Sequence, residues 1–314
     1  MTSNGIIRFA FSEQCSKTVE FGGFKWTAYE HFNCYSVSVA EQCTVLKCEP
    51  QIKSTVLWSC LAKGTFDLVA ASGSKQATFH IWNSRFHGRH RRIHVHQSVA
   101  SFNDAESVCP KRSYGQIHIE IVECFIADLL KPDNPLIEDT SDAARFKFEE
   151  FSWLWREKPL NPEVKKTNKE IWLSKKVLGF HSPFFHNLFT MDFKEKMEDS
   201  YELKEININE FSHFLAIIHG IYDPIDKYSV EGLLKLGDQF MCKIVVQRCE
   251  EYLQISLDKD FPLAEKLRLA NLYRLHKLLM DTVDRMTTFE LKSLPRLGLS
   301  QFAKDLISQK LSSF

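Results

Sequence analysis

The 314-residue sequence predicts an α+β protein of several parts: an N-terminal antiparallel β-sandwich, then an α/β domain and a C-terminal helical extension. Apolar residues recur with a period of two through roughly the first 125 residues, as they do in β-strands. A segment rich in proline and acid follows, and from Asn209 onward the period is that of an α-helix, about 3.6 residues. The predicted boundaries are 1–127 for the sandwich, 128–145 for a linker, 146–256 for the α/β domain and 257–314 for the extension.

Three stretches of the first half carry the strand pattern most clearly. The stretch "CYSVSVAEQ" alternates from Tyr35 to Val39, and "LWSCLAKGTFDLVAASG" is rich in β-forming residues before a Ser-Gly turn. The stretch "QIHIEIVECF" places Ile117, Ile119 and Ile121 on one face and mostly polar residues on the other. Alternating runs with short turns between them predict antiparallel strands that bury one face.

The second half carries helices and two short strands. After the linker we expect about ten residues of amphipathic helix within "AARFKFEEFSWLWRE", and strands at "KEIWL" and "YELKEI". Helical spacing recurs in "NEFSHFLAIIHG", "SVEGLLKLGDQFM", "VVQRCEEYLQI", "FPLAEKLRLANLY", "LHKLLMDTVDRM" and "LSQFAKDLISQKL". Ser229 is placed to cap the second of these helices, and Pro262 lies in the first turn of the fourth, where proline is tolerated.

Composition argues against several classes of protein. The chain has 40 basic and 40 acidic residues, so it is not a generic polyanion binder. Its nine cysteines form no CxxC pair, which argues against a zinc module and favours small apolar residues in a reducing compartment. We see neither a secretory leader nor an apolar run of about 20 residues. We therefore expect a soluble intracellular protein of the cytoplasm or nucleus, with no membrane contact.

The stretch "KKVLGFHSPFFHNLF" holds four phenylalanines and two histidines around one Ser-Pro. So many rings must be buried or face a partner. Ser182-Pro183 should end one helix and begin the next, with Ser182 as the cap and Pro183 in the first turn. We interpret His181 and His186 as packing or surface residues, because no nucleophile or orienting group stands at a recognisable spacing from them.

The order of elements around this stretch resembles the BTB (POZ) domain. That family has a strand, a helix pair with Val/Ile-Leu, Ser-x-x-Phe and a terminal Phe, and then an acidic segment, a strand and further helices. The matching residues are Val177, Leu178, His181, Ser182, Pro183, Phe185, Leu188 and Phe189. The "LGDQF" helix also agrees in order and spacing, and the resemblance runs from Phe148 to Ile255.

The first hairpin departs from the family's pattern. The family usually opens its first strand with an aspartate, for which Asn161 is the nearest match, and that strand is apolar where this chain has "PEVKKTNK". We therefore expect a degraded hairpin, which leaves open whether the chain forms the family's homodimer. The residues expected in a dimer contact or in the core are Phe148, Phe151, Trp153, Leu154, Trp155, Phe185 and Phe189.

The first half is similar to the MATH (TRAF-like) β-sandwich, which precedes the BTB domain in the MATH-BTB adaptors. The residues that carry this likeness are "FGGFKW" with Trp26, "VLWSCLAKGTFDLVA" with Trp58 and "YGQIHIEIVE" with Tyr114. The helices after Phe261 then correspond to the helical extension that follows BTB in such proteins.

The resemblance implies an adaptor that performs no bond chemistry. In the family the sandwich holds a protein substrate and the BTB domain holds the cullin scaffold of a ubiquitin ligase, which raises the effective concentration of substrate. The family's cullin contact, a hydrophobic-x-Glu triplet, matches Phe193, Lys194 and Glu195. Two alternatives are a shifted placement at Met197-Glu198-Asp199 and a solvated acidic loop. The substrate is not identified by the sequence.

The segment "RFHGRHRRIHVH" is strongly basic and contains Arg85, Arg89, Arg91 and Arg92. These arginines form a candidate basic patch for an acidic peptide, with nucleic acid as the less favoured partner. An ordinary solvated hairpin is the plainest interpretation. The side chains of His94 and His96 would point the same way on a strand, but two histidines without a third ligand make a weak metal site. We expect no metal and no other cofactor.

Other classes of function remain as alternatives to the adaptor. One is a BTB scaffold that binds no cullin and acts in homotypic, transcriptional or cytoskeletal assembly. An enzyme is not expected, because the sequence has no GxGxxG, GxxxxGK(S/T), HExxH or GxSxG motif. Co-purification of a cullin separates adaptor from scaffold, and salt-dependent retention on heparin separates either from a nucleic-acid binder.

Overall fold

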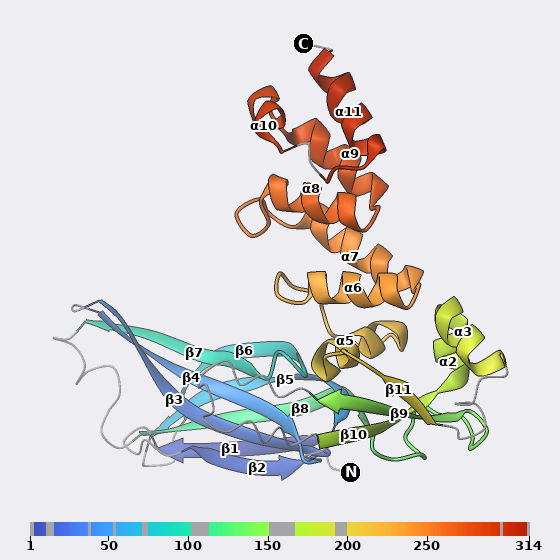
Figure 1. Cartoon of the computed structure of the whole chain (residues 1–314). Coiled ribbons are helices and arrows are strands. Elements are labelled where there is room, and N and C mark those ends of the chain that lie inside the picture. The colour runs from blue at the N-terminus through green and yellow to red at the C-terminus, as the bar shows by residue number, and fades with distance from the viewer. Residues whose placement is uncertain are drawn as a thin grey trace, which may run out of the picture. The chain divides into compact units, whose positions relative to one another are not determined.

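The computed structural model describes residues 3–10, 16–36, 39–52, 55–70, 75–101, 113–150, 167–191, 200–295 and 298–312. The chain comprises two compact units (Figure 1). The first unit is Met1–Pro135 together with the short segment Ile221–Asp223. The second unit is Leu136–Gly220 and Pro224–Phe314.

Antiparallel strands build the first unit. They are β1 (Asn4–Ala10), β2 (Lys17–Phe21), β3 (Phe24–Ser36), β4 (Val39–Pro50), β5 (Val56–Ala70), β6 (Lys75–His87), β7 (Arg92–Ser101) and β8 (Ser113–Asp128). In the described part of the chain they form two four-stranded sheets, with the strand orders β1-β8-β5-β6 and β2-β3-β4-β7. They form the blue to green part of the ribbon in Figure 1. The antiparallel sheets predicted from the period of two are confirmed.

A shared aromatic core joins the two sheets. Trp26 of β3 packs edge-on against Phe86 of β6, with 5.4 Å between ring centroids. Phe24 of β3 lies 5.6 Å from Trp58 of β5. All four side chains are buried, and each contact links a strand of one sheet to a strand of the other. The sheets are therefore held face to face by rings as well as by aliphatic side chains.

Of two strands predicted for this unit, one is confirmed and the other is divided between two strands. Ile117 and Ile119 of β8 are buried and Glu120 is exposed, as the alternation predicts. The stretch "CYSVSVAEQ" is not a single strand, because its residues are divided between β3 and β4, which pair antiparallel with Ser36 opposite Val39. Apolar alternation can continue from one strand into the next when no Gly or Pro separates them, so the pattern alone missed this division.

The second unit is built around a small mixed sheet. Its strands are β9 (Ala143–Glu150), β10 (Thr167–Ser174) and β11 (Ser200–Leu203), in the order β10-β9-β11. Strand β10 runs antiparallel to β9, whereas β11 runs parallel to it. The strands predicted at "KEIWL" and "YELKEI" are thereby confirmed.

Ala143–Glu150 forms a strand, so the helix expected in this stretch is wrong over these residues. Phe146 and Phe148 are buried, whereas Arg145 and Lys147 are more exposed. This is a period of two. Pairing with β10 on one side and β11 on the other holds the backbone extended, and a pattern this short does not reveal such partners.

The β9–β10 hairpin is intact, which corrects the expectation of a degraded one. Every residue pair from Ser174 opposite Ala143 to Thr167 opposite Glu150 is in register. Asp142 stands directly before β9, so it, rather than Asn161, is the aspartate that opens the first strand. The polar "PEVKKTNK" is not the first strand, because its last three residues begin β10; the others, and Asn161, lie outside the described residues.

Helices complete the second unit. They are α2 (Lys175–His181), α3 (Pro183–Thr190), α5 (Ile208–Ile218), α6 (Val230–Gln239), α7 (Lys243–Ile255), α8 (Leu263–Leu272), α9 (His276–Arg285), α10 (Thr288–Ser293) and α11 (Gln301–Ser312). The helices predicted from the 3.6 period are confirmed. Helix α10 is not among them, although Thr287 and Glu290 form a reciprocal capping box whose Thr-x-x-Glu signature is readable in the sequence. Ser229 precedes α6 as expected, but its hydroxyl donates to the Asp226 carbonyl and caps no helix amide.

A buried lysine ties the helical extension to α7. Lys266 of α8 is fully buried, and its ammonium donates to the carbonyl of Ser256 (2.7 Å) and to the carboxylate of Asp258 (3.3 Å). Asp258 also accepts a hydrogen bond from Arg285 of α9. A buried ammonium needs such partners to offset its lost hydration. The end of α7, α8 and α9 are therefore linked through one lysine and one carboxylate.

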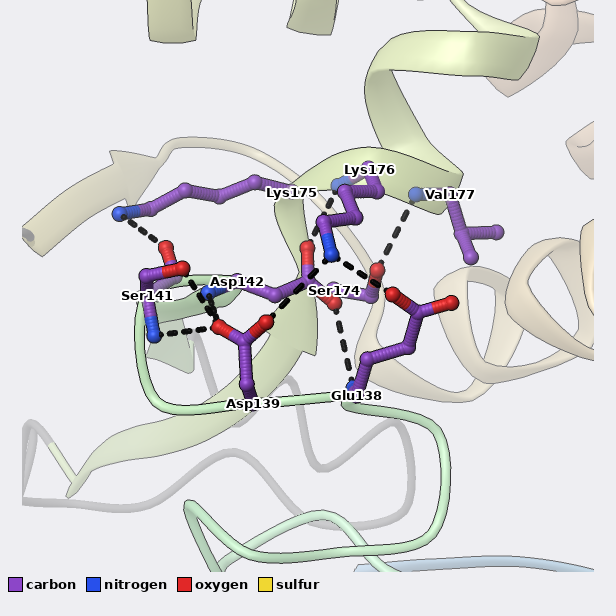
Figure 2. Close-up of polar contacts among 8 residues, drawn as sticks. All are labelled: Glu138, Asp139, Ser141, Asp142, Ser174, Lys175, Lys176 and Val177. Atoms are coloured by element: carbon purple, nitrogen blue, oxygen red, sulfur yellow. Dashed lines mark hydrogen bonds and ion pairs between the residues drawn. The ribbon is translucent and has the colours of Figure 1, made fainter.

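A polar turn before β9 fixes the start of α2, as Figure 2 shows. One carboxylate oxygen of Asp142 accepts the backbone N–H of Lys176 (2.8 Å), and the Asp142 carbonyl accepts that of Lys175 (2.8 Å). Ser174 caps the same helix, because its hydroxyl accepts the N–H of Val177 (3.1 Å). The first amides of α2 thus receive acceptors that the helix itself cannot supply.

Exposed charges surround this turn. Lys176 Nζ lies 2.6 Å from Glu138 and 3.5 Å from Asp139. The Ser141 hydroxyl and the backbone N–H of Asp142 donate to Asp139, and these hydrogen bonds lower the pKa of Asp139 to about 2. Exposed ion pairs of this kind contribute little to stability on their own. Asp142 is the buried centre of the turn, with 2% of its surface exposed.

Replacing Asp142 with alanine should lower the free energy of unfolding by about 1–2 kcal/mol, because the N–H of Lys176 at the start of α2 and the N–H of Glu138 lose their side-chain acceptor. Asp142→Asn keeps one oxygen in place and should recover most of the loss. Urea unfolding followed by circular dichroism measures both variants. Asp133→Ala, at an exposed aspartate, is the control. A loss for Asp142→Ala no larger than for this control would contradict the capping role.

Candidate functional site

The helix pair α2–α3 is broken at Ser182-Pro183, as predicted. The Ser182 hydroxyl accepts the N–H of Phe185 (3.1 Å) and caps α3, whose first residue is Pro183. The same hydroxyl donates to the carbonyl of Phe240, which follows α6 (2.5 Å). Ser182 is 1% exposed. One buried hydroxyl therefore starts α3 and also fastens it to the end of α6.

Phenylalanines of the helix pair fill the seam between the sheet and the helices. Phe185 lies 4.7 Å from Phe240 and 5.9 Å from Phe146 of β9, measured between ring centroids. Phe189 lies 5.2 Å from the ring of Tyr201 on β11. This packing explains how so short a stretch carries so many rings, because three of the four are partly or fully removed from water.

Phe180 is the exception among these rings. It is 85% exposed near the end of α2, while Leu178 on the same helix is fully buried. Met191, directly after α3, is 50% exposed. A large ring held in water by a short and well-capped helix is a candidate anchor for a protein partner.

Two histidines of the second unit interact with each other, His181 at the end of α2 and His219 after α5. Burial lowers the pKa of His181. His219 follows α5, and its Nε2 atom is buried without a hydrogen-bond partner among the described residues. Burial lowers the pKa of His219 to about 4; the charge of His181 acts in the same direction and Asp142 opposes it. His219 was not singled out by the sequence, because only the folded chain brings it near Asp142. His186 is exposed.

The predicted core or dimer residues fall into two groups. Phe148 and Phe185 are buried core residues, and Phe189 is partly buried against Tyr201. The residues that lie outside the described part are Phe151, Trp153, Leu154 and Trp155, together with Phe193, Lys194 and Glu195 of the predicted cullin contact and the alternative Met197-Glu198-Asp199. The roles of this second group stay predictions.

Carboxylates accompany three of the four arginines in the predicted basic patch. The ion pairs are Arg85–Glu123 (2.9 Å), Arg89–Asp223 (3.0 Å) and Arg91–Glu49 (3.5 Å). Arg92 is exposed on β7. His87 and His90 exchange backbone hydrogen bonds across the turn, as in a hairpin, but β6 and β7 then continue in different sheets. Binding of an acidic partner at these arginines stays a prediction. Three of the four positive charges are already paired with carboxylates of the same chain.

The predicted histidine pair straddles an irregularity in β7. His94 stands opposite Val45 and His96 opposite Thr44, with a register shift between them, and the side chain of His96 lies outside the described part. Over the residues that the structure describes, no group of three His, Cys, Asp or Glu side chains could hold a metal ion. Nor does any described helix combine the length and apolar character needed to cross a membrane.

The low pKa of His219 predicts an acid-sensitive fold. Below the ordinary histidine pKa of about 6.5 the unfolded chain binds a proton that folded His219 does not take up until about pH 4. Stability should therefore fall as the pH drops through this window, by about 2 kcal/mol between pH 7 and pH 5 from this group alone.

Urea unfolding of the wild type and of His219→Gln at pH 7 and pH 5 tests this pH dependence. The variant should lose about 2 kcal/mol less on acidification than the wild type does. His186→Gln, at an exposed histidine, is the matched control and should behave as the wild type. An equal loss in wild type and His219→Gln would show that this side chain is not held neutral.

Comparison with known proteins identifies the domain that contains these elements. A family model of the BTB/POZ domain matches residues 163–257. BTB and MATH domain-containing protein 38 of Caenorhabditis elegans is 33% identical over 110 residues, which are 35% of this chain and 28% of that protein. Protein 36 of the same series and organism is 31% identical over 122 residues, which are 39% of this chain and 38% of that protein. Each match thus spans well under half of the relative's length.

The family match covers part of the second unit. The matched range takes in β10, α2, α3, β11 and the helices through α7. BTB domains are modules of protein–protein interaction, and two antiparallel sheets precede this one in the same chain. The chain therefore contains a BTB/POZ domain, and its architecture is consistent with that of the BTB and MATH domain-containing family.

Proposed function

We propose that this chain is a substrate adaptor of a cullin-RING ubiquitin ligase. In this proposal the paired sheets hold a protein substrate and the BTB domain holds the cullin, inside the cell in the cytoplasm or nucleus. The adaptor breaks no bond itself and acts by raising the effective concentration of substrate beside the ligase. The observation that carries the proposal is the match to the BTB domain over residues 163–257, with β9 and β10 paired in register, preceded in one chain by two antiparallel sheets that share a core.

The proposed cullin contact lies between two anchored elements of the BTB domain. Phe193 and Glu195 fall in the sequence between α3, which ends at Thr190, and β11, which begins at Ser200. Helix α3 is fixed by the Ser182 cap, and β11 is fixed by its pairing with β9. A ring that fills a partner's pocket and a carboxylate that accepts charge-assisted hydrogen bonds together give affinity and orientation.

Phe193→Ala combined with Glu195→Ala should abolish cullin binding and leave the domain folded. Loss of a central anchor ring costs about 2 kcal/mol or more, which corresponds to at least a roughly 30-fold weaker complex. Affinity purification of the tagged full chain from cell extract, followed by mass spectrometry, measures the recovered cullin. The thermal unfolding midpoint of the purified variant tests whether it is folded.

The matched control is Met197→Ala combined with Asp199→Ala, which tests the shifted placement of the triplet. Loss of cullin in the first double variant alone supports the Phe193/Glu195 contact. Loss in the control alone moves the contact to Met197 and Asp199. A cullin that co-purifies equally with both variants and the wild type would remove this segment from the interface, and no cullin in any sample would favour a scaffold.

Self-association is the alternative function, and the exposed Phe180 is the observation that favours it. A second copy of the chain offers the same ring, so a symmetric contact would bury both at once. A BTB scaffold of this kind would assemble homotypically without a cullin. The two functions are compatible, because a dimeric adaptor would gain avidity for substrate.

Phe180→Ser should weaken any dimer at least roughly ten-fold, because each interface would lose two large rings. Sedimentation velocity of the purified full chain over a range of concentrations measures the dissociation constant. Phe289→Ser is the matched control, since Phe289 on α10 is also a phenylalanine and is 81% exposed. A monomeric wild type, or equal effects of the two variants, would count against self-association through α2.

A further inference from the structure

Three cysteines of the first unit lie close together. Cys48 on β4 and Cys60 on β5 are fully buried in the core that the two sheets share. Their side chains are hydrogen-bonded to each other. Cys124 on β8 is exposed to solvent, and it lies near enough to Cys48 to raise the pKa of that thiol. An exposed thiol therefore adjoins two buried ones.

Cys60 and Cys124 stand directly opposite each other in the antiparallel pairing of β5 with β8. Opposite residues in such a pair have Cα atoms about 4.5–5.5 Å apart, and their side chains leave the same face of the sheet. Disulfides span Cα separations of about 4.4–6.8 Å. The register of these two strands thus meets the backbone requirement for a bridge between Cys60 and Cys124.

Cys124 is open to solvent because β8 extends past its neighbour in the sheet. The pairing of β1 with β8 runs from Asn4 opposite Glu120 to Ala10 opposite Tyr114, so Cys124 lies beyond the described end of β1. Cys60 is fully buried between the sheets. A small oxidant in solution therefore reacts with Cys124 first. Cys60 is the neighbouring thiol that can then react with the oxidised Cys124.

We propose that a peroxide oxidises this cluster to a cross-strand disulfide between Cys60 and Cys124. The Cys124 thiolate attacks one oxygen of hydrogen peroxide, the O–O bond breaks, and sulfenic acid forms while the departing hydroxide takes up a proton as water. The Cys60 thiolate then attacks the sulfenic sulfur, the S–O bond breaks, and a second water leaves. In sum, two thiols lose two electrons and two protons, and one peroxide becomes two waters.

The environment of Cys124 makes its oxidation by peroxide slow. Burial and the neighbouring Cys60 and Glu123 raise the pKa of the Cys124 thiol, so little thiolate is present at neutral pH. Sustained oxidant is needed, in contrast to a sensor cysteine whose pKa is depressed. In a reducing compartment the bridge reverts by thiol exchange, because Cys124 keeps one sulfur near solvent.

The test uses the full chain, reduced, freed of reductant and incubated with hydrogen peroxide. The remaining thiols are blocked with N-ethylmaleimide in denaturant, and a tryptic digest is analysed by mass spectrometry without reduction. Cleavage after Lys47, Lys53, Lys63 and Arg112 places Cys48, Cys60 and Cys124 on three separate peptides. A linked pair of peptides therefore identifies the two bridged cysteines, and the wild-type chain suffices for this.

We expect the peptide of Cys60 to be linked to that of Cys124, in at least roughly ten-fold excess over any other cysteine link, with Cys48 carrying maleimide. Cys124→Ser should remove the link, whereas Cys249→Ser, at a buried cysteine of α7, should leave it unchanged. A link between Cys48 and Cys60 would overturn the proposal. So would maleimide on all three cysteines, or Cys124 carried to sulfinic acid with Cys60 still labelled by maleimide.

Discussion

The packing of the Phe185 ring against the Phe240 ring, with 4.7 Å between their centroids, is the contact on which the BTB domain depends. Phe240 is fully buried and also meets Phe211 and Phe214 of α5, so α3, α5 and the end of α6 converge on one ring. Ser182 secures the same point through its hydrogen bond to the Phe240 carbonyl. Dispersion in such a close-packed cluster is collectively large, and removing a core phenylalanine typically costs about 3–5 kcal/mol. A shift of α3, α5 or the end of α6 would therefore disturb the contacts of the other two with Phe240.

Elements that local chemistry determines were predictable from the sequence. Ser182-Pro183 joins a capping side chain to a residue without an N–H, so it separates two helices whatever surrounds it. Strand β9 was not predictable, because its conformation comes from its partners β10 and β11. Its alternation extends over only Ala143–Glu150, and the aromatic run that follows in the sequence suits a helix equally well. Because a helix was expected over Ala143–Glu150, the first strand of the BTB hairpin was assigned to the polar segment "PEVKKTNK". The hairpin was for this reason expected to be degraded.

The candidate site was predictable only where residues act on their neighbours in sequence. Asp142 caps an amide of Lys176, 34 residues away, and no local pattern records that pairing. Cys60 and Cys124 are brought together by the register of two strands, which the sequence does not state either. Phe180 belongs to the same short aromatic run as the buried rings, and a helix of seven residues is too short for its pattern to show which ring faces water.

Helix α2 shows how stability and recognition can be assigned to different residues of one element. Asp142 and Ser174 fix its first turn, and Leu178 is buried, so the exposed Phe180 is carried on a backbone with little freedom left. An anchor held in this way loses little conformational entropy on binding, a cost that otherwise weakens a small interface. The rings that hold the domain together, such as Phe185, are not the ring that is exposed. In the proposed self-association a second copy would therefore bind Phe180 without rearrangement of the core, because the exposed ring is not one of those that hold the fold together.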